Sequence, residues 1–182
     1  MDAITKLEGA RRHLDEAIKL FFEDRDPLVV HTVVAAAQGT LRDIAKATGT
    51  AHLSILHDHP NIPAENRTDW INRLNRPRNF FKHADKDHDA ILEFDIKDNI
   101  DTLLDSVLLY WAVHSEPLSS ANVFMGWFTT KHPEMRGSFS ENKIGNYCAR
   151  NGFSPESKRQ FRDLIDTRVL LDPAVSRHVP PP

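Results

Sequence analysis

Hydrophobic side chains recur three or four positions apart in four long stretches of the first 116 residues, which is the spacing of an amphipathic helix. In the first stretch, about residues 3–24, charged residues fill the opposite face. Its apolar stripe consists of Ile4, Leu7, Leu14, Ile18, Phe21 and Phe22. The second stretch, residues 27–48, is apolar around much of its circumference, so we predict two helices, of which the second is the more buried.

Local capping signals mark both ends of the second helix. Asp26 can accept hydrogen bonds from the first free backbone N–H groups, and Pro27 suits the first helical position. Gly49 favours the left-handed conformation that closes many helices. We therefore predict a helix that begins at Pro27 and ends just before Gly49.

The third stretch contains a proline. Its helix is expected to begin near Ala64, and its apolar stripe consists of Trp70, Ile71 and Leu74. Because proline lacks the backbone N–H and clashes with the preceding turn, Pro77 predicts a kink or a restart, with residues 78–84 as the last turns. Phe80 and Phe81 are expected to anchor these turns in the core.

The fourth stretch carries the longest apolar stripe. Asp95 is the predicted N-cap, Asp98 lies near the positive helix end, and Pro117 ends the segment. The stripe consists of Ile96, Ile100, Leu103, Leu104, Val107, Leu108 and Trp111. Four long helices joined by turns or modest loops predict an all-α fold in which residues 1–116 form an antiparallel four-helix bundle.

Residues 117–182 are predicted to be a helical C-terminal extension with a mobile, proline-rich tail. Residues 119–131 form an expected fifth helix. Ser138 with Glu141 matches a capping box, and the dipeptide at 154–155 predicts the start of another helix.

The composition indicates a protein with a substantial core and little net charge. Hydrophobic residues make up 40% of the chain, and the net charge of −3 does not indicate a nucleic-acid or membrane partner across the whole surface. Cys148 is the only cysteine, which excludes an internal disulfide. We find no secretory signal at the N-terminus and no run of about 18 apolar residues. We therefore expect a soluble cytoplasmic protein with no membrane partner, in which any basic site is local.

One such basic site surrounds the stretch Arg78-Asn79-Phe80-Phe81-Lys82-His83, which has the form R-x4-H. Asn79 directly follows the arginine, and the motif lies at the end of a predicted bundle helix. Residues 65–83 carry five basic side chains against two acidic ones. A local positive site on an acidic chain suits the binding of phosphate groups.

This motif and the helical pattern of residues 1–116 resemble the HEPN superfamily of α-helical bundle proteins, which includes many metal-independent endoribonucleases. The preferred motif of that superfamily has a polar residue, often asparagine, after the arginine, and Asn79 supplies it. The resemblance implies that no metal and no cofactor is needed, and that two motifs face each other in a homodimer. It does not extend to the C-terminal third of the chain.

The reaction that the resemblance implies is RNA cleavage by attack of the 2′-hydroxyl on the adjacent phosphorus, which leaves a 2′,3′-cyclic phosphate and a 5′-hydroxyl end. His83 is the candidate general acid or base, because histidine titrates near neutral pH. Arg78 is the candidate for stabilising the charged phosphorane, with Asn79 as an orienting partner. The residues expected to guide the RNA backbone are Arg73, Arg76 and Lys82.

Helix geometry favours a composite site. Asn79 and His83 are four residues apart and share a helix face, whereas Arg78 lies about 140° round the helix from His83. Arg78 therefore reaches round the helix or serves a partner subunit. Because one motif supplies one histidine and acid–base catalysis is easier with two, we predict a two-fold symmetric dimer with both motifs at one groove.

Other interpretations of the motif stay open. His83 can cap the helix C-terminus, and Arg78 can pair with a nearby carboxylate. The chain would then be a HEPN-like module that binds RNA or an antitoxin-like protein partner without cutting, or an unrelated helical protein. Two further arginine–histidine pairs, Arg25…His31 and Arg76…His83, match versions of the motif in which more than four residues separate the arginine from the histidine.

Three other features have a structural interpretation beside a chemical one. The histidines and aspartates at 57–59 and 83–88 could hold a metal, although histidines on a solvated loop are the alternative. Cys148 is expected to be a small buried residue rather than a nucleophile. Trp127 and Phe128 could stack on bases, but core packing is the favoured interpretation.

Overall fold

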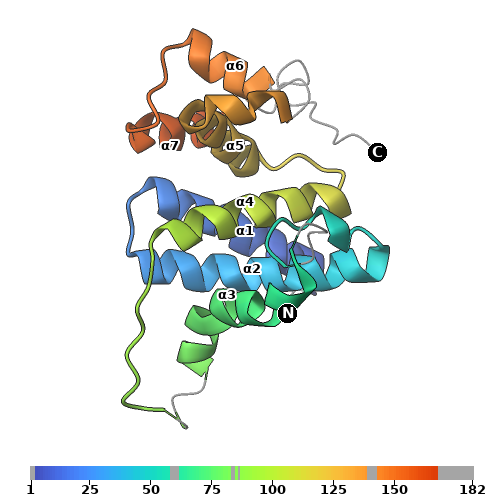
Figure 1. The fold of residues 1–182 in the computed structure, drawn as a ribbon. Helices are drawn as coiled ribbons and strands as arrows, with labels where there is room; N and C mark the ends of the chain where they lie inside the picture. Colours follow the sequence, from blue (N-terminus) through green and yellow to red (C-terminus); the bar gives the residue numbers. More distant parts are fainter. Residues whose placement is uncertain (1–2, 58–61, 83–84, 86, 139–142, 168–182) are drawn as a thin grey trace. The chain divides into compact units, whose positions relative to one another are not determined.

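The computed structural model describes residues 3–57, 62–82, 85, 87–138 and 143–167 (Figure 1). Within these residues every regular element is a helix, which confirms the predicted all-α class. None of the described helices is both long and apolar enough to cross a membrane. The chain divides into two compact units: unit 1 comprises residues 1–14 and 26–113, and unit 2 comprises residues 15–25 and 114–182.

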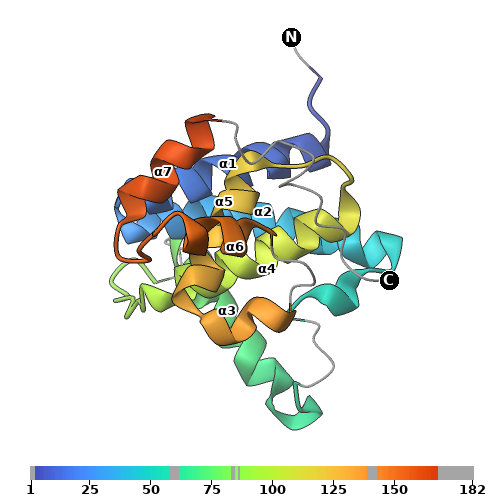
Figure 2. The same ribbon diagram turned by 90° about the horizontal axis from the view of Figure 1, so that it is seen from above.

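Unit 1 is built around a pair of packed helices. Its elements are the first part of α1 (Lys6–Phe22), α2 (Pro27–Thr48), the short 3-10 helices η1 (Ala51–Leu53) and η2 (Ala64–Asn66), α3 (Arg67–Lys82) and α4 (Lys97–Val113). Helices α2 and α4 lie side by side and run in the same direction (Figures 1 and 2). Their shared core includes Val30, Val34, Leu41, Leu103, Val107 and Tyr110, all of which are buried.

The predicted caps of α2 are confirmed. The Asp26 carboxylate accepts hydrogen bonds from the backbone N–H of Leu28 at 2.8 Å and of Val29 at 3.4 Å. Pro27 occupies the first helical position, and Gly49 adopts a left-handed φ of 79° directly after the last helical residue. These caps fix where α2 begins and ends.

Helix α3 does not restart at its proline. It continues through Pro77, which is buried, to Lys82. The helix loses a backbone hydrogen bond at Pro77 without ending there. Of the two predicted alternatives at Pro77, the restart is wrong and the kink stays a prediction. The prediction that the motif lies in the last turns of this helix is confirmed for residues 78–82.

Two residues predicted for the core stripes are exposed. Ile4 is 54% exposed and Ile96 is 61% exposed. Both precede the first residue of their helices, Lys6 and Lys97, so the helical periodicity does not apply to them. Asp95 lies in the turn before α4, where its carboxylate accepts from the backbone N–H of Lys97 at 2.9 Å.

Unit 2 consists of the remainder of α1, α5 (Ser119–Lys131), η3 (Pro133–Ser138), α6 (Lys143–Arg150) and α7 (Lys158–Thr167). The bounds of α5 agree with the predicted fifth helix. Helix α7 begins at Lys158 rather than at the predicted 154–155, where the Pro155 carbonyl instead accepts a hydrogen bond from Trp127 Nε1 at 2.9 Å. Of the predicted capping box, Ser138 ends η3 and Glu141 lies outside the described residues.

Aromatic side chains fill the core of unit 2. The rings of Phe21 and Trp127 meet edge to face at 4.9 Å, and those of Phe22 and Phe161 stack at 5.8 Å. Trp127 and Phe128 are buried, which favours the core interpretation of this pair over base stacking. Such ring pairs contribute stability beyond the area that they bury.

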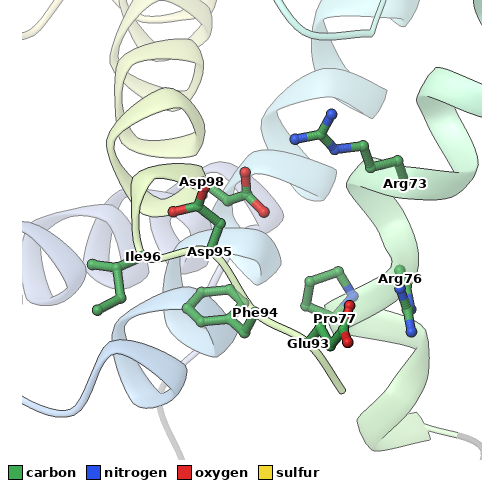
Figure 3. Close-up of a pocket in the computed structure, with 8 residues that line it drawn as sticks. All are labelled: Arg73, Arg76, Pro77, Glu93, Phe94, Asp95, Ile96 and Asp98. Atoms are coloured by element: carbon green, nitrogen blue, oxygen red, sulfur yellow. The ribbon is translucent and has the colours of Figure 1, made fainter. Parts of the chain in front are cut away.

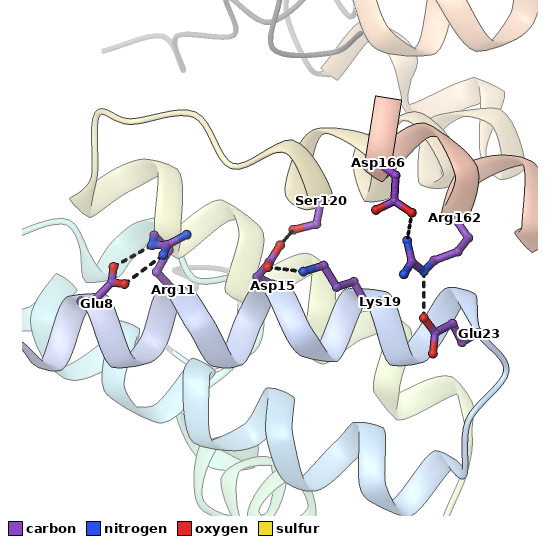
Figure 4. Close-up of polar contacts among 8 residues, drawn as sticks. All are labelled: Glu8, Arg11, Asp15, Lys19, Glu23, Ser120, Arg162 and Asp166. Carbon is purple, nitrogen blue, oxygen red and sulfur yellow. Dashed lines mark hydrogen bonds and ion pairs between the residues drawn. The ribbon is translucent and has the colours of Figure 1, made fainter. Parts of the chain in front are cut away.

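Polar contacts join the helices of unit 2 around this core (Figure 4). Asp15 on α1 accepts a hydrogen bond from Ser120 Oγ on α5 at 2.7 Å. Arg162 on α7 bonds Glu23 at 2.8 Å and Asp166 at 2.9 Å. The hydrogen bond from Arg162 holds the pKa of Glu23 below its usual value. Each of these polar groups therefore has a partner within unit 2.

Candidate functional site

The predicted motif occupies the last turns of α3. Arg78, Asn79 and Lys82 are exposed there, and so are Arg76 and Arg73, which precede Arg78 by two and five residues on the same helix. His83, the candidate general acid or base, lies outside the described residues. Phe81 is 50% exposed, so the prediction that it is a core anchor is wrong.

The Arg78 side chain lies against helix α2. A Cβ atom placed on Gly39 would be only 2.8 Å from Arg78 Nη1 and 3.4 Å from Cζ. Contacts under 3.0 Å essentially never occur at a real Cβ, so a larger residue at position 39 would force the end of the Arg78 side chain to shift. Gly39 is thus the local reason why the motif arginine can approach the backbone of α2.

Buried polar residues of α2 and α4 hold the segment that precedes α3. Asp105 on α4 is fully buried, and its carboxylate accepts from Gln38 Nε2 at 2.8 Å and from Ser54 Oγ at 2.9 Å. It also accepts from the backbone N–H groups of Ile55 at 2.7 Å and Leu56 at 3.3 Å. Four donors satisfy the buried carboxylate and fix this turn against α4.

His57 belongs to this network. It is 5% exposed, so the prediction of a solvated histidine is wrong at this position. Gln38 Nε2 donates to Asp105 and also lies 3.0 Å from His57 Nδ1, which makes Nδ1 the acceptor of the second amide hydrogen. Trp70 on α3 donates its Nε1–H to the Leu56 carbonyl at 2.5 Å, so the same turn also positions α3.

A second buried histidine lies on the same face of α2. His31 Nδ1 is 3.0 Å from Asn99 Oδ1, and Asn99 Nδ2 donates to the Pro27 carbonyl at 2.9 Å. Because a carbonyl can only accept, this chain of contacts makes Asn99 Oδ1 the acceptor and His31 Nδ1 the donor. Burial lowers the pKa of His31, although the hydrogen bond with Asn99 and the charge of Asp98 act in the opposite direction. His31 is therefore neutral, with its lone pair on Nε2.

These residues surround a small cavity between α2, α3 and the 54–57 turn. The cavity has a volume of about 20 Å³. Its lining includes both buried histidines and the motif arginine, and the polar residues among the lining are His31, Gln38, His57, Asn75, Arg78 and Thr102. The lining of this cavity thus combines Arg78 with residues of α2 that the motif itself does not contain.

A larger groove lies between α3 and the start of α4, with a volume of about 580 Å³ (Figure 3). Arg73 and Arg76 line its α3 side, and Pro77 and Phe94 contribute apolar surface. Three carboxylates share the groove: Glu93, Asp95 and Asp98. Acidic groups thus offset the positive charge that residues 65–83 suggested, so the local potential is weaker than the sequence alone indicates.

The sequence contains one signal for the buried polar network around Asp105. Gln38 and Asp105 are polar residues on otherwise apolar stretches of α2 and α4. A polar residue at a core position must find a partner when it is buried. The identity of the partners does not follow from the sequence, because Gln38 and Asp105 are 67 positions apart.

Among the described residues, no group of three or more His, Cys, Asp or Glu side chains is arranged to hold a metal ion. Of the predicted metal cluster, Asp58, His59 and His83 lie outside the described residues. Cys148 is fully buried, as expected for a small core residue.

Comparison with protein-family models, with curated proteins and with solved structures gave no match for this chain. The role of the candidate site is therefore inferred from the residues of this chain and their contacts alone.

Proposed function

We propose that the protein is a metal-independent endoribonuclease and that unit 1 is a HEPN-like, antiparallel four-helix bundle. In this proposal His83 transfers protons as a general acid or base. Arg78 stabilises the negative charge of the phosphorane, and Asn79 orients the reacting groups. Lys82, Arg76 and Arg73 guide the RNA backbone.

The single observation that supports the proposal best is the position of the Arg78 guanidinium. It lies against Gly39 beside a polar cavity, so the end of this exposed side chain rests on helix α2. A positioned guanidinium loses less freedom when it binds a phosphate, and it is already placed when charge develops. A purely structural surface arginine needs no such space in a neighbouring helix.

The proposal includes a two-fold symmetric homodimer, because one motif provides a single histidine. Exposed apolar side chains near the motif support a protein interface at this end of unit 1. Phe81 is 50% exposed and Ile96 61% exposed, and Ile91 is also exposed in the connection between α3 and α4. Of these three, Ile96 lines the charged groove, and exposed apolar residues are common at interaction surfaces.

Cleavage of RNA in the presence of EDTA tests the proposal. We expect the wild type to cut single-stranded RNA without metal and to leave a 2′,3′-cyclic phosphate. His83→Ala should lower the rate about a hundredfold or more, because proton transfer by a positioned side chain contributes about that much. His88→Ala, which removes an exposed histidine of the following turn, is the matched control and should leave the rate unchanged. A wild type that leaves varied single-stranded RNAs intact would contradict the proposal.

A non-catalytic binding module is the second candidate, and the groove of Figure 3 favours it. Glu93, Asp95 and Asp98 face the groove together with Arg73 and Arg76, and a mixed-charge surface suits a protein partner better than a phosphate backbone. This alternative predicts a stable dimer or partner complex without turnover. Its affinity should not change in His83→Ala, whereas charge reversal at Arg76 should weaken it.

A further inference from the structure

His31, which lines the cavity beside Arg78, has a buried nitrogen without a partner in the described part of the chain. His31 is 3% exposed, and its Nε2 has no hydrogen-bond partner among the described residues. Because Nδ1 donates to Asn99, Nε2 carries the lone pair and can only accept. A buried acceptor left unpaired costs stability, so its presence at the wall of a cavity indicates that something donates to it.

The cavity limits what that donor can be. Its volume of about 20 Å³ holds one water molecule and excludes a nucleotide. A water molecule also needs other polar partners, and the Arg78 guanidinium, which lines the same cavity, provides N–H donors. One molecule that donates to His31 and accepts from Arg78 satisfies both groups.

We propose that this cavity binds one buried water molecule, which donates to His31 Nε2 and accepts from Arg78, and that His31 and Gly39 are therefore positioning residues for the motif arginine. Gly39 leaves the space in which the guanidinium lies. His31 holds the water molecule that fixes the orientation of the guanidinium. The two residues lie eight positions apart on α2, on the face that meets Arg78.

The bound water and the position of the guanidinium do not depend on any reaction. Their effect on RNA cleavage rests on the proposed function. The two can be tested separately, because the order of an arginine side chain is measurable without substrate.

The structural test uses the wild-type protein and two glycine variants. A high-resolution crystal structure of the wild type should show one water molecule within hydrogen-bond distance of His31 Nε2 and of Arg78. In solution, NMR should show His31 as the Nδ1–H tautomer and slow solvent exchange of the Arg78 Nε–H. Gly39→Ala should accelerate that exchange about tenfold, because the new Cβ displaces the guanidinium. Gly9→Ala is the matched control, because a Cβ on this helical glycine meets no atom within 4 Å, and it should leave the exchange unchanged.

A second variant tests the water molecule by itself. His31→Asn keeps a side-chain N–H near the position of Nδ1, and so keeps the bond to Asn99, but it removes Nε2. We expect faster Arg78 exchange in this variant with the helical content retained. An Nε2–H tautomer of His31 in the wild type, an empty cavity, or Arg78 exchange that neither Gly39→Ala nor His31→Asn changes would each overturn the proposal.

The cleavage assay separates this proposal from the proposed function. If both hold, Gly39→Ala should lower kcat without raising KM, and Gly9→Ala should keep both at the wild-type value. If the wild type shows the bound water and the ordered arginine but cuts no RNA, the positioning of Arg78 stands and the nuclease function fails.

Discussion

Gly39 in unit 1 and Gly126 in unit 2 are both helical glycines that a side chain from another helix approaches closely. The approaching side chain is polar at Gly39 and apolar at Gly126. A Cβ on Gly126 would be 2.6 Å from Ile144 Cγ2 and 3.1 Å from Cys148 Sγ, which are buried side chains of α6. A Cβ on Gly39 would meet the end of a flexible, charged side chain. The glycine of unit 2 serves close packing of a core, whereas the glycine of unit 1 makes room for a polar group at the surface.

The two units also differ in how many large hydrophobic side chains they expose. Among the described residues, the exposed large hydrophobic side chains all belong to unit 1: Ile4, Leu28, Val29, Leu53, Phe81, Ile91 and Ile96. In the described helices of unit 2, Tyr147 is half-buried and the other aromatic residues are buried. Exposed apolar side chains of this kind are common at interaction surfaces, so unit 1 is the part of the chain on which the proposed function is placed.

Among the substitutions that test the difference between the two units, the largest loss of stability is expected in the polar interior of unit 1. Asp105→Ala leaves four donors around Asp105 unpaired, including the backbone N–H groups of Ile55 and Leu56. We expect a loss of about 3–5 kcal/mol in the free energy of unfolding, measured by urea titration. Asp43→Ala, at an exposed position of α2, is the control and should change the free energy by less than about 0.5 kcal/mol. Equal effects of the two changes would contradict the structural role of Asp105.

Gly126→Ala should produce the next largest effect, and it acts on unit 2. Overpacking against Ile144 and Cys148 costs about 1–3 kcal/mol, and the better helix propensity of alanine returns about 1 kcal/mol. The net expectation is a lower free energy of unfolding, whereas Gly9→Ala should raise it. Thermal unfolding followed by circular dichroism measures both. A stabilised Gly126→Ala would show that α5 and α6 are not closely packed at this glycine.

A smaller effect than those of the two substitutions above is expected from His31, which should make stability depend on pH. Burial lowers its pKa in the folded state from the ordinary value of 6.5. As pH falls below about 6.5, the unfolded chain binds a proton at this residue while the folded chain does not, so stability is lost until the folded pKa is reached. For one proton, the free energy of unfolding cannot change by more than about 1.4 kcal/mol per pH unit.

Comparison of wild type with His31→Asn isolates this contribution. Urea titrations between pH 8 and pH 5 should give a shallower acid loss in the variant than in the wild type. Parallel curves for the two proteins would mean that His31 titrates normally in the folded state.

Local features of the fold were predictable from the sequence, and distant contacts were not. Asp26, Pro27 and Gly49 bound α2 through contacts with neighbouring residues, so their signal lies within a few positions. The spacing of apolar residues likewise located α5. Ile96 was misassigned because the periodicity was extended past the first residue of α4.

The candidate site shows the same limit. The motif and its place at the end of α3 could be predicted, because both are properties of one segment. The contact between Arg78 and Gly39, and the hydrogen bond between Gln38 and His57, join separate segments of the sequence. Periodicity does not specify such pairs, because they depend on how α2, α3 and α4 pack. The positive charge of residues 65–83 was overestimated for a related reason, since Glu93, Asp95 and Asp98 come from the connection to α4 and from its first turn.

The central claim, that unit 1 carries a metal-independent ribonuclease site, is tested most directly by one substrate change. A short RNA is compared with the same strand carrying a 2′-deoxy nucleotide at the cleaved position, both in EDTA. The account predicts that the wild type cuts the RNA to a 2′,3′-cyclic phosphate, leaves the deoxy strand intact, and loses activity in His83→Ala. Cleavage of the deoxy strand at the same rate, or an RNA that stays intact with the folded wild-type protein, would contradict it.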